Sequence, residues 1–91
     1  MKDIDRLRSK LDKIDLEILG LLLKRLEIVR KIGSIKNMQN LPIVDSKREE
    51  EVYNNVITFA SEHDLDSNQI KSIFHEIILL SKKVQNDSLN H

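Results

Sequence analysis

Two positively charged residues of this chain share one side of a helical pattern with apolar residues. At roughly 100° of rotation per residue, Arg25 and Lys36 fall within a narrow apolar stripe. The apolar members of that stripe are Leu11, Ile18, Val29 and Ile32. One such cation can extend to the edge of the apolar face or pair with a carboxylate. Two together indicate a site for an anion, because an unpaired buried charge is costly.

Arg8 lies at the margin of the same stripe, where a solvated or salt-bridged arginine is the ordinary interpretation. It precedes Arg25 by 17 residues, or ~25 Å along a helix axis. That separation is too large for both to hold one small molecule from one helix. In an antiparallel dimer, Arg8 of one chain would approach Arg25 and Lys36 of the other, and two subunits would build the site.

Polar residues also interrupt the apolar faces of the later segments. Ser81 and Gln85 are one helical turn apart on an apolar side, where they would supply neutral hydrogen-bonding groups beside the cations. Asp45, Arg48 and Glu49 border the apolar face of the middle segment. For these three, the ordinary interpretation is that they belong to the start of a helix, where acids are favoured.

Other kinds of site find little support. The chain has no cysteine, and His63, His75 and His91 lack the spacing of metal ligands. Ser81 has no histidine base nearby, and no glycine-rich phosphate loop is present. We therefore expect a small organic dianion as ligand, with no metal or other cofactor.

The net charge and the length of the apolar stretches limit which partners and which location we expect. Fifteen basic and 15 acidic residues cancel, which leaves no long-range field for nucleic acid or an anionic membrane. The charged N-terminus is unlike a leader peptide, and no stretch approaches ~18 uninterrupted apolar residues. We expect a cytoplasmic protein that binds neither nucleic acid nor a membrane.

Three helices would position the candidate residues within a single domain of residues 1–91. Apolar spacings of three and four predict helices over about 4–38, 46–61 and 67–85, with the tail 86–91 frayed. Pro42 lies in the first connection. The capping-box patterns that start the later helices are Ser-Lys-Arg-Glu at 46–49 and Asp-Ser-Asn-Gln at 66–69.

The first helix is too long for a compact single chain. About 35 residues span ~52 Å, whereas a compact domain of this size has a radius of gyration of roughly 12 Å. Because the apolar stripe runs the full length, the simplest partner is a second copy. We predict an all-α, intertwined homodimer with three helices per chain.

The ordered set of these residues resembles the all-helical chorismate mutases, three-helix chains that interlock into homodimers. The resemblance covers nearly the whole chain in the family's order and spacing, although each motif alone is weak. The segments that carry it are 7–15, 22–25, 32–36, 42–49 and 77–85.

Residue by residue, the resemblance implies that Arg25, with Arg8 of the partner subunit, clamps the two carboxylates of the substrate. Lys36 would hold a carboxylate and the ether oxygen, and Gln85 would be the second donor to that oxygen. Glu49 would receive the ring hydroxyl. The remaining implied pocket residues are Ser81, as a carboxylate contact, and Asp45 and Arg48 in support.

The implied reaction is the rearrangement of chorismate to prephenate in the shikimate pathway of aromatic amino-acid biosynthesis. An ether bond breaks while a carbon–carbon bond forms, without a nucleophile, metal or cofactor. The enzyme would hold the diaxial chair-like conformer and stabilise negative charge on the ether oxygen. Some relatives have glutamate in place of Gln85, which must be protonated to donate, whereas a glutamine donates at any pH.

Three functions stay open. A monofunctional chorismate mutase comes first, since the chain ends just beyond Gln85, although a domain cut from a fusion fits as well. A lyase that removes pyruvate from isochorismate ranks lower, because that branch does not keep the Asp45, Arg48 and Glu49 pattern. The third is a non-catalytic helical dimer that binds an aromatic metabolite.

Overall fold

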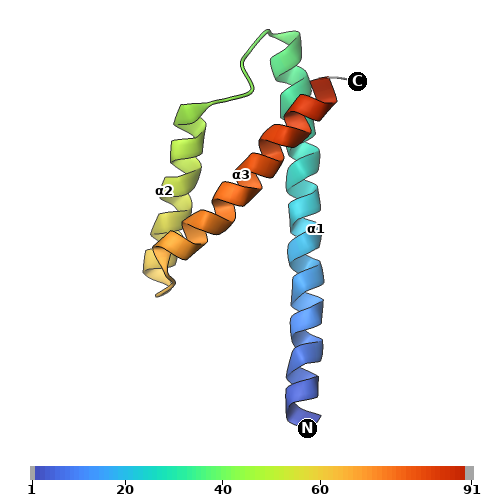
Figure 1. The fold of residues 1–91 in the computed structure, drawn as a ribbon, viewed down its shortest axis with the longest axis vertical. Coiled ribbons are helices and arrows are strands. Elements are labelled where there is room, and N and C mark those ends of the chain that lie inside the picture. Colours follow the sequence, from blue (N-terminus) through green and yellow to red (C-terminus); the bar gives the residue numbers. More distant parts are fainter. Residues whose placement is uncertain (1, 90–91) are drawn as a thin grey trace.

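The computed structural model describes residues 2–89 and places them in three α-helices. They are α1 (Lys2–Met38), α2 (Ser46–Glu62) and α3 (Ser67–Leu89) (Figure 1). The all-α, three-helix prediction is confirmed for this part of the chain. Helix α3 continues through residues 86–89, past its predicted end at residue 85, and no glycine or proline after Val84 interrupts the helical hydrogen bonds there. Residues 90 and 91 lie outside the described residues.

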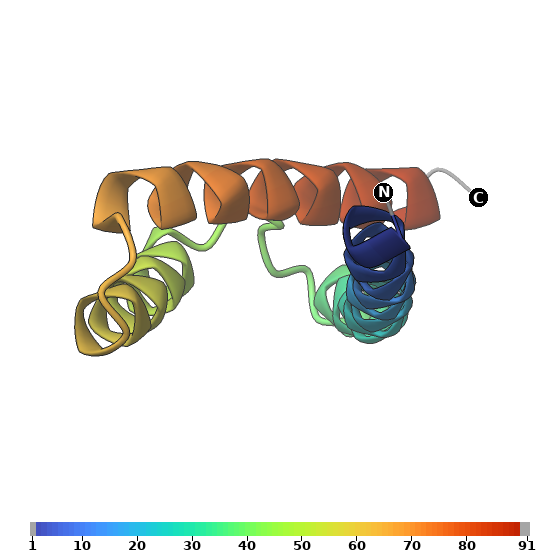
Figure 2. The same ribbon diagram turned by 90° about the horizontal axis from the view of Figure 1, so that it is seen from below.

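Helix α3 holds the other two helices together. It packs against both α1 and α2, whereas α1 and α2 do not pack directly against each other within the described residues. Viewed from below, α1 and α2 lie on the same side of α3 (Figure 2). α1 extends far past the crossing with α3 (Figure 1), and the molecule measures 56 × 30 × 14 Å.

The start of α2 differs from the prediction by one residue. The cap is Asp45 and not Ser46, because the Asp45 Oδ1 atom accepts the backbone N–H of Arg48 at 3.0 Å. A carboxylate there also faces the positive end of the helix dipole. α3 is capped in the same way, with the N–H of Gln69 donating to Asp66 Oδ1 at 3.0 Å.

The connection after α1 turns the chain back over the helix end. Asn40 adopts a positive φ of 55°, and the N–H of Leu41 donates to the carbonyl of Lys36 at 2.8 Å. This is a Schellman motif at the C-terminus of α1, in which Asn40 adopts the left-handed conformation usually held by glycine. Helix α1 therefore ends before Pro42, and the carbonyl of Ile43 comes back to the side chain of Lys36.

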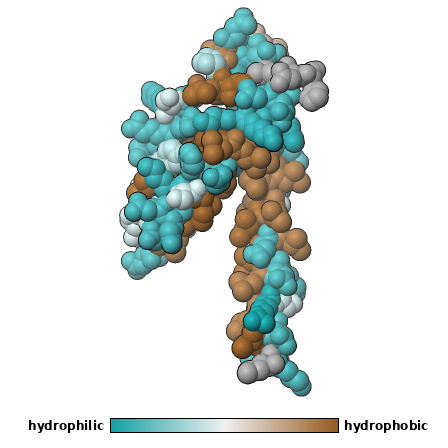
Figure 3. Space-filling view, in the orientation of Figure 1, coloured by the Kyte–Doolittle hydropathy of each residue, from teal (hydrophilic) through white to brown (hydrophobic). Residues whose placement is uncertain are grey.

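The apolar core of the single chain is small. Its buried members are Val29, Val52, Ala60 and Ile78. Most apolar side chains of α1 are exposed, including Leu7 at 59% and Leu11 at 56%, and the space-filling view shows apolar surface along the projecting part of α1 (Figure 3). None of the helices formed by residues 2–89 combines the length and apolar character needed to span a membrane.

Candidate active site

A cavity of about 220 Å³ lies where the three helices converge. Of the eight predicted site residues, seven line it: Arg25, Lys36, Asp45, Arg48, Glu49, Ser81 and Gln85. Lys82 also lines the cavity, so that four cations and two carboxylates face it. The lining cations outnumber the lining carboxylates by two, which would balance the two negative charges of a dianion, and the apolar wall includes Val29, Ile32, Val52 and Ile78.

Arg25 is held at the cavity wall by α3. Its Nη1 atom donates to the Ser81 hydroxyl oxygen at 2.6 Å, and that hydroxyl donates to the carbonyl of Ile77 at 2.8 Å. Loss of solvation through burial lowers the pKa of Arg25, and the nearby charge of Arg48 lowers it further. Both causes disfavour the bare cation, so an anion in the cavity would be stabilised by it.

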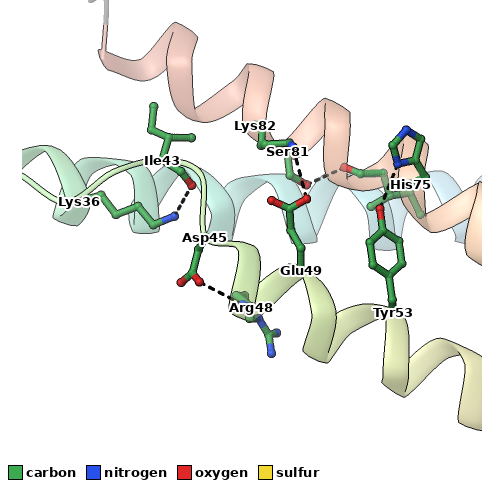
Figure 4. Close-up of polar contacts among 10 residues, drawn as sticks. Lys36, Ile43, Asp45, Arg48, Glu49, Tyr53, His75, Ser81 and Lys82 are labelled. Atoms are coloured by element: carbon green, nitrogen blue, oxygen red, sulfur yellow. Dashed lines mark hydrogen bonds and ion pairs between the residues drawn. The ribbon is translucent and has the colours of Figure 1, made fainter.

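Lys36 joins three segments of the chain. Its Nζ atom donates to the carbonyl of Ile43 at 2.8 Å, drawn in Figure 4, and to Oε1 of Gln85 at 3.2 Å. An ammonium group only donates, so the Gln85 atom that faces it must be the amide oxygen. The amide nitrogen of Gln85 is therefore the end that can donate to a ligand.

Gly33 brings α1 close to α3 one turn before Lys36. A Cβ atom added at Gly33 would lie 3.2 Å from Cγ and 3.4 Å from Cα of Gln85. Any larger residue would push on the segment that carries Gln85. Gly33 was not predicted as a site residue, although a glycine inside a helical pattern is a recognised sign of close packing.

At the other end of the cavity, Glu49 of α2 faces Lys82 of α3. Their Nζ and Oε1 atoms are 3.4 Å apart (Figure 4). Lys82 was also missed, because a lysine on a helix is usually solvated. Arg48 lies at the rim, where its guanidinium pairs with the exposed Glu51 at 3.3 Å.

Arg8 does not reach this cavity within its own chain. It is exposed on the projecting part of α1, 17 residues and ~25 Å before Arg25. The structure therefore brings seven of the predicted site residues together and leaves Arg8 apart.

The described histidines make other contacts. His75 shares a hydrogen bond of 3.0 Å with the Tyr53 hydroxyl (Figure 4), and His63 stacks on Phe59. Among residues 2–89, no group of three or more histidine, aspartate or glutamate side chains is placed to hold a metal ion. His91 lies outside the described residues.

A three-helix fold with a cationic cavity between its helices defines an all-α domain suited to a small dianion. The chain belongs to the chorismate mutase type II family, whose family model matches residues 7–86. A relative from Methanocaldococcus jannaschii, named chorismate mutase, is 32% identical over 89 residues, which cover 98% of this chain and 90% of that protein.

Two further proteins extend the comparison. A relative from Streptomyces pristinaespiralis, named 4-amino-4-deoxychorismate mutase, is 26% identical over 84 residues, or 92% of this chain and 65% of that one. A solved structure, described as a conserved hypothetical protein from Pyrococcus furiosus, is 45% identical with a TM-score of 0.74. The match covers 93% of this chain and 97% of the solved one.

Proposed function

We propose that this chain is a chorismate mutase, an isomerase that converts chorismate to prephenate. Family membership and the similarity to the named archaeal chorismate mutase support the reaction. The observation that carries the proposal is the cavity, where two excess positive charges meet an apolar wall. This combination fits a dianion with a hydrocarbon ring.

Arg25 would bind a carboxylate of the substrate. The planar guanidinium can form two parallel hydrogen bonds with a carboxylate, and its 2.6 Å bond to Ser81 keeps it in place. Because burial disfavours the isolated cation, an arriving carboxylate recovers part of that cost. Fixing the carboxylates selects the conformer in which the reacting carbons are close.

Lys36 and Gln85 would stabilise the ether oxygen as its bond to carbon breaks. Two of the three ammonium protons of Lys36 are directed at Ile43 and Gln85, which leaves one for a ligand. The amide nitrogen of Gln85 is the second donor. Donors positioned before the reaction stabilise the developing charge without solvent reorganisation. Glu49 would receive the ring hydroxyl.

We also propose an intertwined homodimer in which each cavity is completed by Arg8 of the partner subunit. The support is the exposed apolar stripe of α1 together with the distance of Arg8 from its own cavity. An antiparallel second copy would cover the stripe and carry its Arg8 toward Arg25 and Lys36.

The relatives reported above are mutases by name, which favours the mutase over the isochorismate lyase. Because the family is one of enzymes, it also favours catalysis over binding alone. The place in aromatic amino-acid biosynthesis and the cytoplasmic location stay predictions.

The test is to measure chorismate loss and prephenate formation together on the purified chain. We expect equal rates for the two. Pyruvate from isochorismate, with no prephenate from chorismate, would assign the lyase activity instead. Binding of chorismate without turnover would support the non-catalytic alternative. Lys36→Ala should lower kcat/KM by roughly 10²–10³-fold with the helices intact, the size expected for a lost oxyanion donor.

A further inference from the structure

Lys82 is a cation of the cavity that the reaction as proposed does not use. It lies on α3 beside Ser81, and its Nζ atom is 3.4 Å from Oε1 of Glu49 on α2. In Figure 4 the two side chains face each other from their separate helices. Their side chains are 29% and 25% exposed, so the interaction is less screened than that of a pair in open solvent.

This pair sets the charge at one end of the cavity. Glu49 alone would make that end negative and attractive to a cationic group. Lys82 offsets the charge of the carboxylate, whereas the charge of Arg48, the residue before Glu49, is offset by Glu51 at the rim. A neutral hydroxyl can still donate to Glu49, whereas an ammonium group would be repelled by the Lys82 ammonium that is already paired with this carboxylate.

The choice between these two groups corresponds to a difference between substrates. The name of the Streptomyces relative describes a compound in which an amine replaces a hydroxyl of chorismate. An aliphatic amine is protonated near neutral pH, as lysine is. The two compounds therefore differ by one positive charge at that ring position.

We infer that Lys82 is a specificity-determining residue, which makes the cavity accept a ring hydroxyl and reject an ammonium group at the same place. The inference rests on the proposed function, because it takes Glu49 as the residue that receives the ring hydroxyl. Lys82 acts on this choice through Glu49 and is not needed for the bond rearrangement itself.

The experiment compares kcat/KM for chorismate and for 4-amino-4-deoxychorismate in the unchanged protein and three variants. Lys82→Met removes the charge at similar length, and Lys82→Arg keeps the charge. Lys83→Met is the matched control, because Lys83 is the exposed neighbour outside the cavity lining. Circular dichroism checks that all variants keep their helices.

We expect the unchanged protein to prefer chorismate, and Lys82→Met to reduce that preference by about tenfold or more. Lys82→Arg and Lys83→Met should keep the preference within about twofold. An unchanged preference in Lys82→Met, or an equal loss for both compounds, overturns the inference.

Failure of the proposed function gives a different result. If the unchanged protein turns over neither compound, the mutase proposal is wrong, and the affinities of the same two compounds measured by calorimetry decide the role of Lys82. Tighter binding of chorismate than of the amino compound, by a margin that Lys82→Met reduces, would support the role of Lys82 in specificity. Equal affinities for the two compounds in the unchanged protein would overturn that role.

Discussion

The two halves of α1 carry the same apolar stripe but lie in different surroundings. From Arg25 onward the helix meets α3, with Val29 and Gly33 buried and Lys36 bonded to Gln85. Before Arg25 the stripe is exposed, and α3 crosses only the other end of the helix (Figure 1). Only one of the halves is covered by its own chain.

This difference shows what a periodic sequence pattern can and cannot specify. Spacings of three and four predict that one side of a helix is to be covered, but they do not say which chain covers it. A stripe that continues past the crossing with α3 leaves a row of exposed apolar side chains, and such a row is typical of a partner site. Because Arg8 lies on that half, covering the stripe and completing the cavity would be one event.

The largest effect is expected from a charge placed in the exposed half. Leu11→Asp should dissociate the proposed dimer and remove nearly all activity, because an unpaired carboxylate would be buried in the interface. Sedimentation velocity measures the dissociation and the prephenate assay the activity. Lys13→Asp introduces the same side chain on the far side of α1 and should leave both unchanged. A fully active Leu11→Asp monomer would contradict the shared site.

The covered half can be tested by making Gln85 ionisable. The unchanged protein should keep its kcat within about twofold between pH 6 and 8, because an amide donates at any pH. Gln85→Glu should lose activity about tenfold per pH unit above the pKa of the new carboxyl, so that pH 5 is favoured over pH 7.

The activity of Gln85→Glu should fall as the pH rises, because the new carboxyl loses its proton. Only the protonated carboxyl can donate to the ether oxygen, and the ionised form repels the charge that develops there. Gln39→Glu, in the exposed connection after α1, is the control and should show the flat profile of the unchanged protein. A steep loss of activity in the unchanged protein between pH 6 and 8, with the dimer intact, would exclude this role of Gln85.

Mixing two variants tests both halves of α1 in one activity measurement, because Arg8 lies in the exposed half and Lys36 in the covered half. Arg8→Ala should lower kcat/KM by about tenfold or more, through the loss of a charge-assisted clamp. Refolding Arg8→Ala together with Lys36→Ala in equal amounts should raise activity to about one quarter of the unchanged protein. Half of the dimers are then mixed, and each mixed dimer has one intact cavity. Activity no higher than the mean of the two variants would mean that Arg8 acts within its own chain or not at all.

Much of this arrangement could be predicted from the sequence. The three-helix class followed from the apolar spacing, and Arg25 and Lys36 were found because cations are unusual on an apolar side. Ser81 and Gln85 were identified because they are polar residues on an apolar side of a predicted helix. In each case the residue type contradicts its position in a local pattern, which a sequence displays directly.

The features that were missed depend on contacts between helices. The pair of Lys82 with Glu49 arises from the packing of α2 on α3, and the sequence gives a lysine there no distinguishing mark. The carbonyl of Ile43 accepts a hydrogen bond from Lys36. Because every residue has a backbone carbonyl, the sequence cannot indicate which one makes this contact. The cap at Asp45 was placed one residue late because Asp45 and Ser46 are both good capping residues.

The smallest effects are expected from replacing one glycine in each half of α1 with alanine. Alanine at either position gains roughly 0.5–1 kcal/mol of helix propensity. At Gly20, an added Cβ meets nothing within 4 Å, so Gly20→Ala should raise the thermal stability and leave kcat unchanged. At Gly33, the new Cβ would lie 3.2 Å from Gln85 Cγ, so Gln85 must move away by a few tenths of an ångström.

Gly33→Ala should therefore lower kcat by severalfold, with little or no gain in stability, because Gln85 is displaced from Lys36. Thermal melts followed by circular dichroism, together with kcat and KM, separate the two glycines. If Gly33→Ala gains as much stability as Gly20→Ala and keeps full turnover, the close approach of α1 and α3 does not position Gln85. The contrast between the two substitutions depends on which half of the helix is already packed within one chain, since their helix propensities are the same.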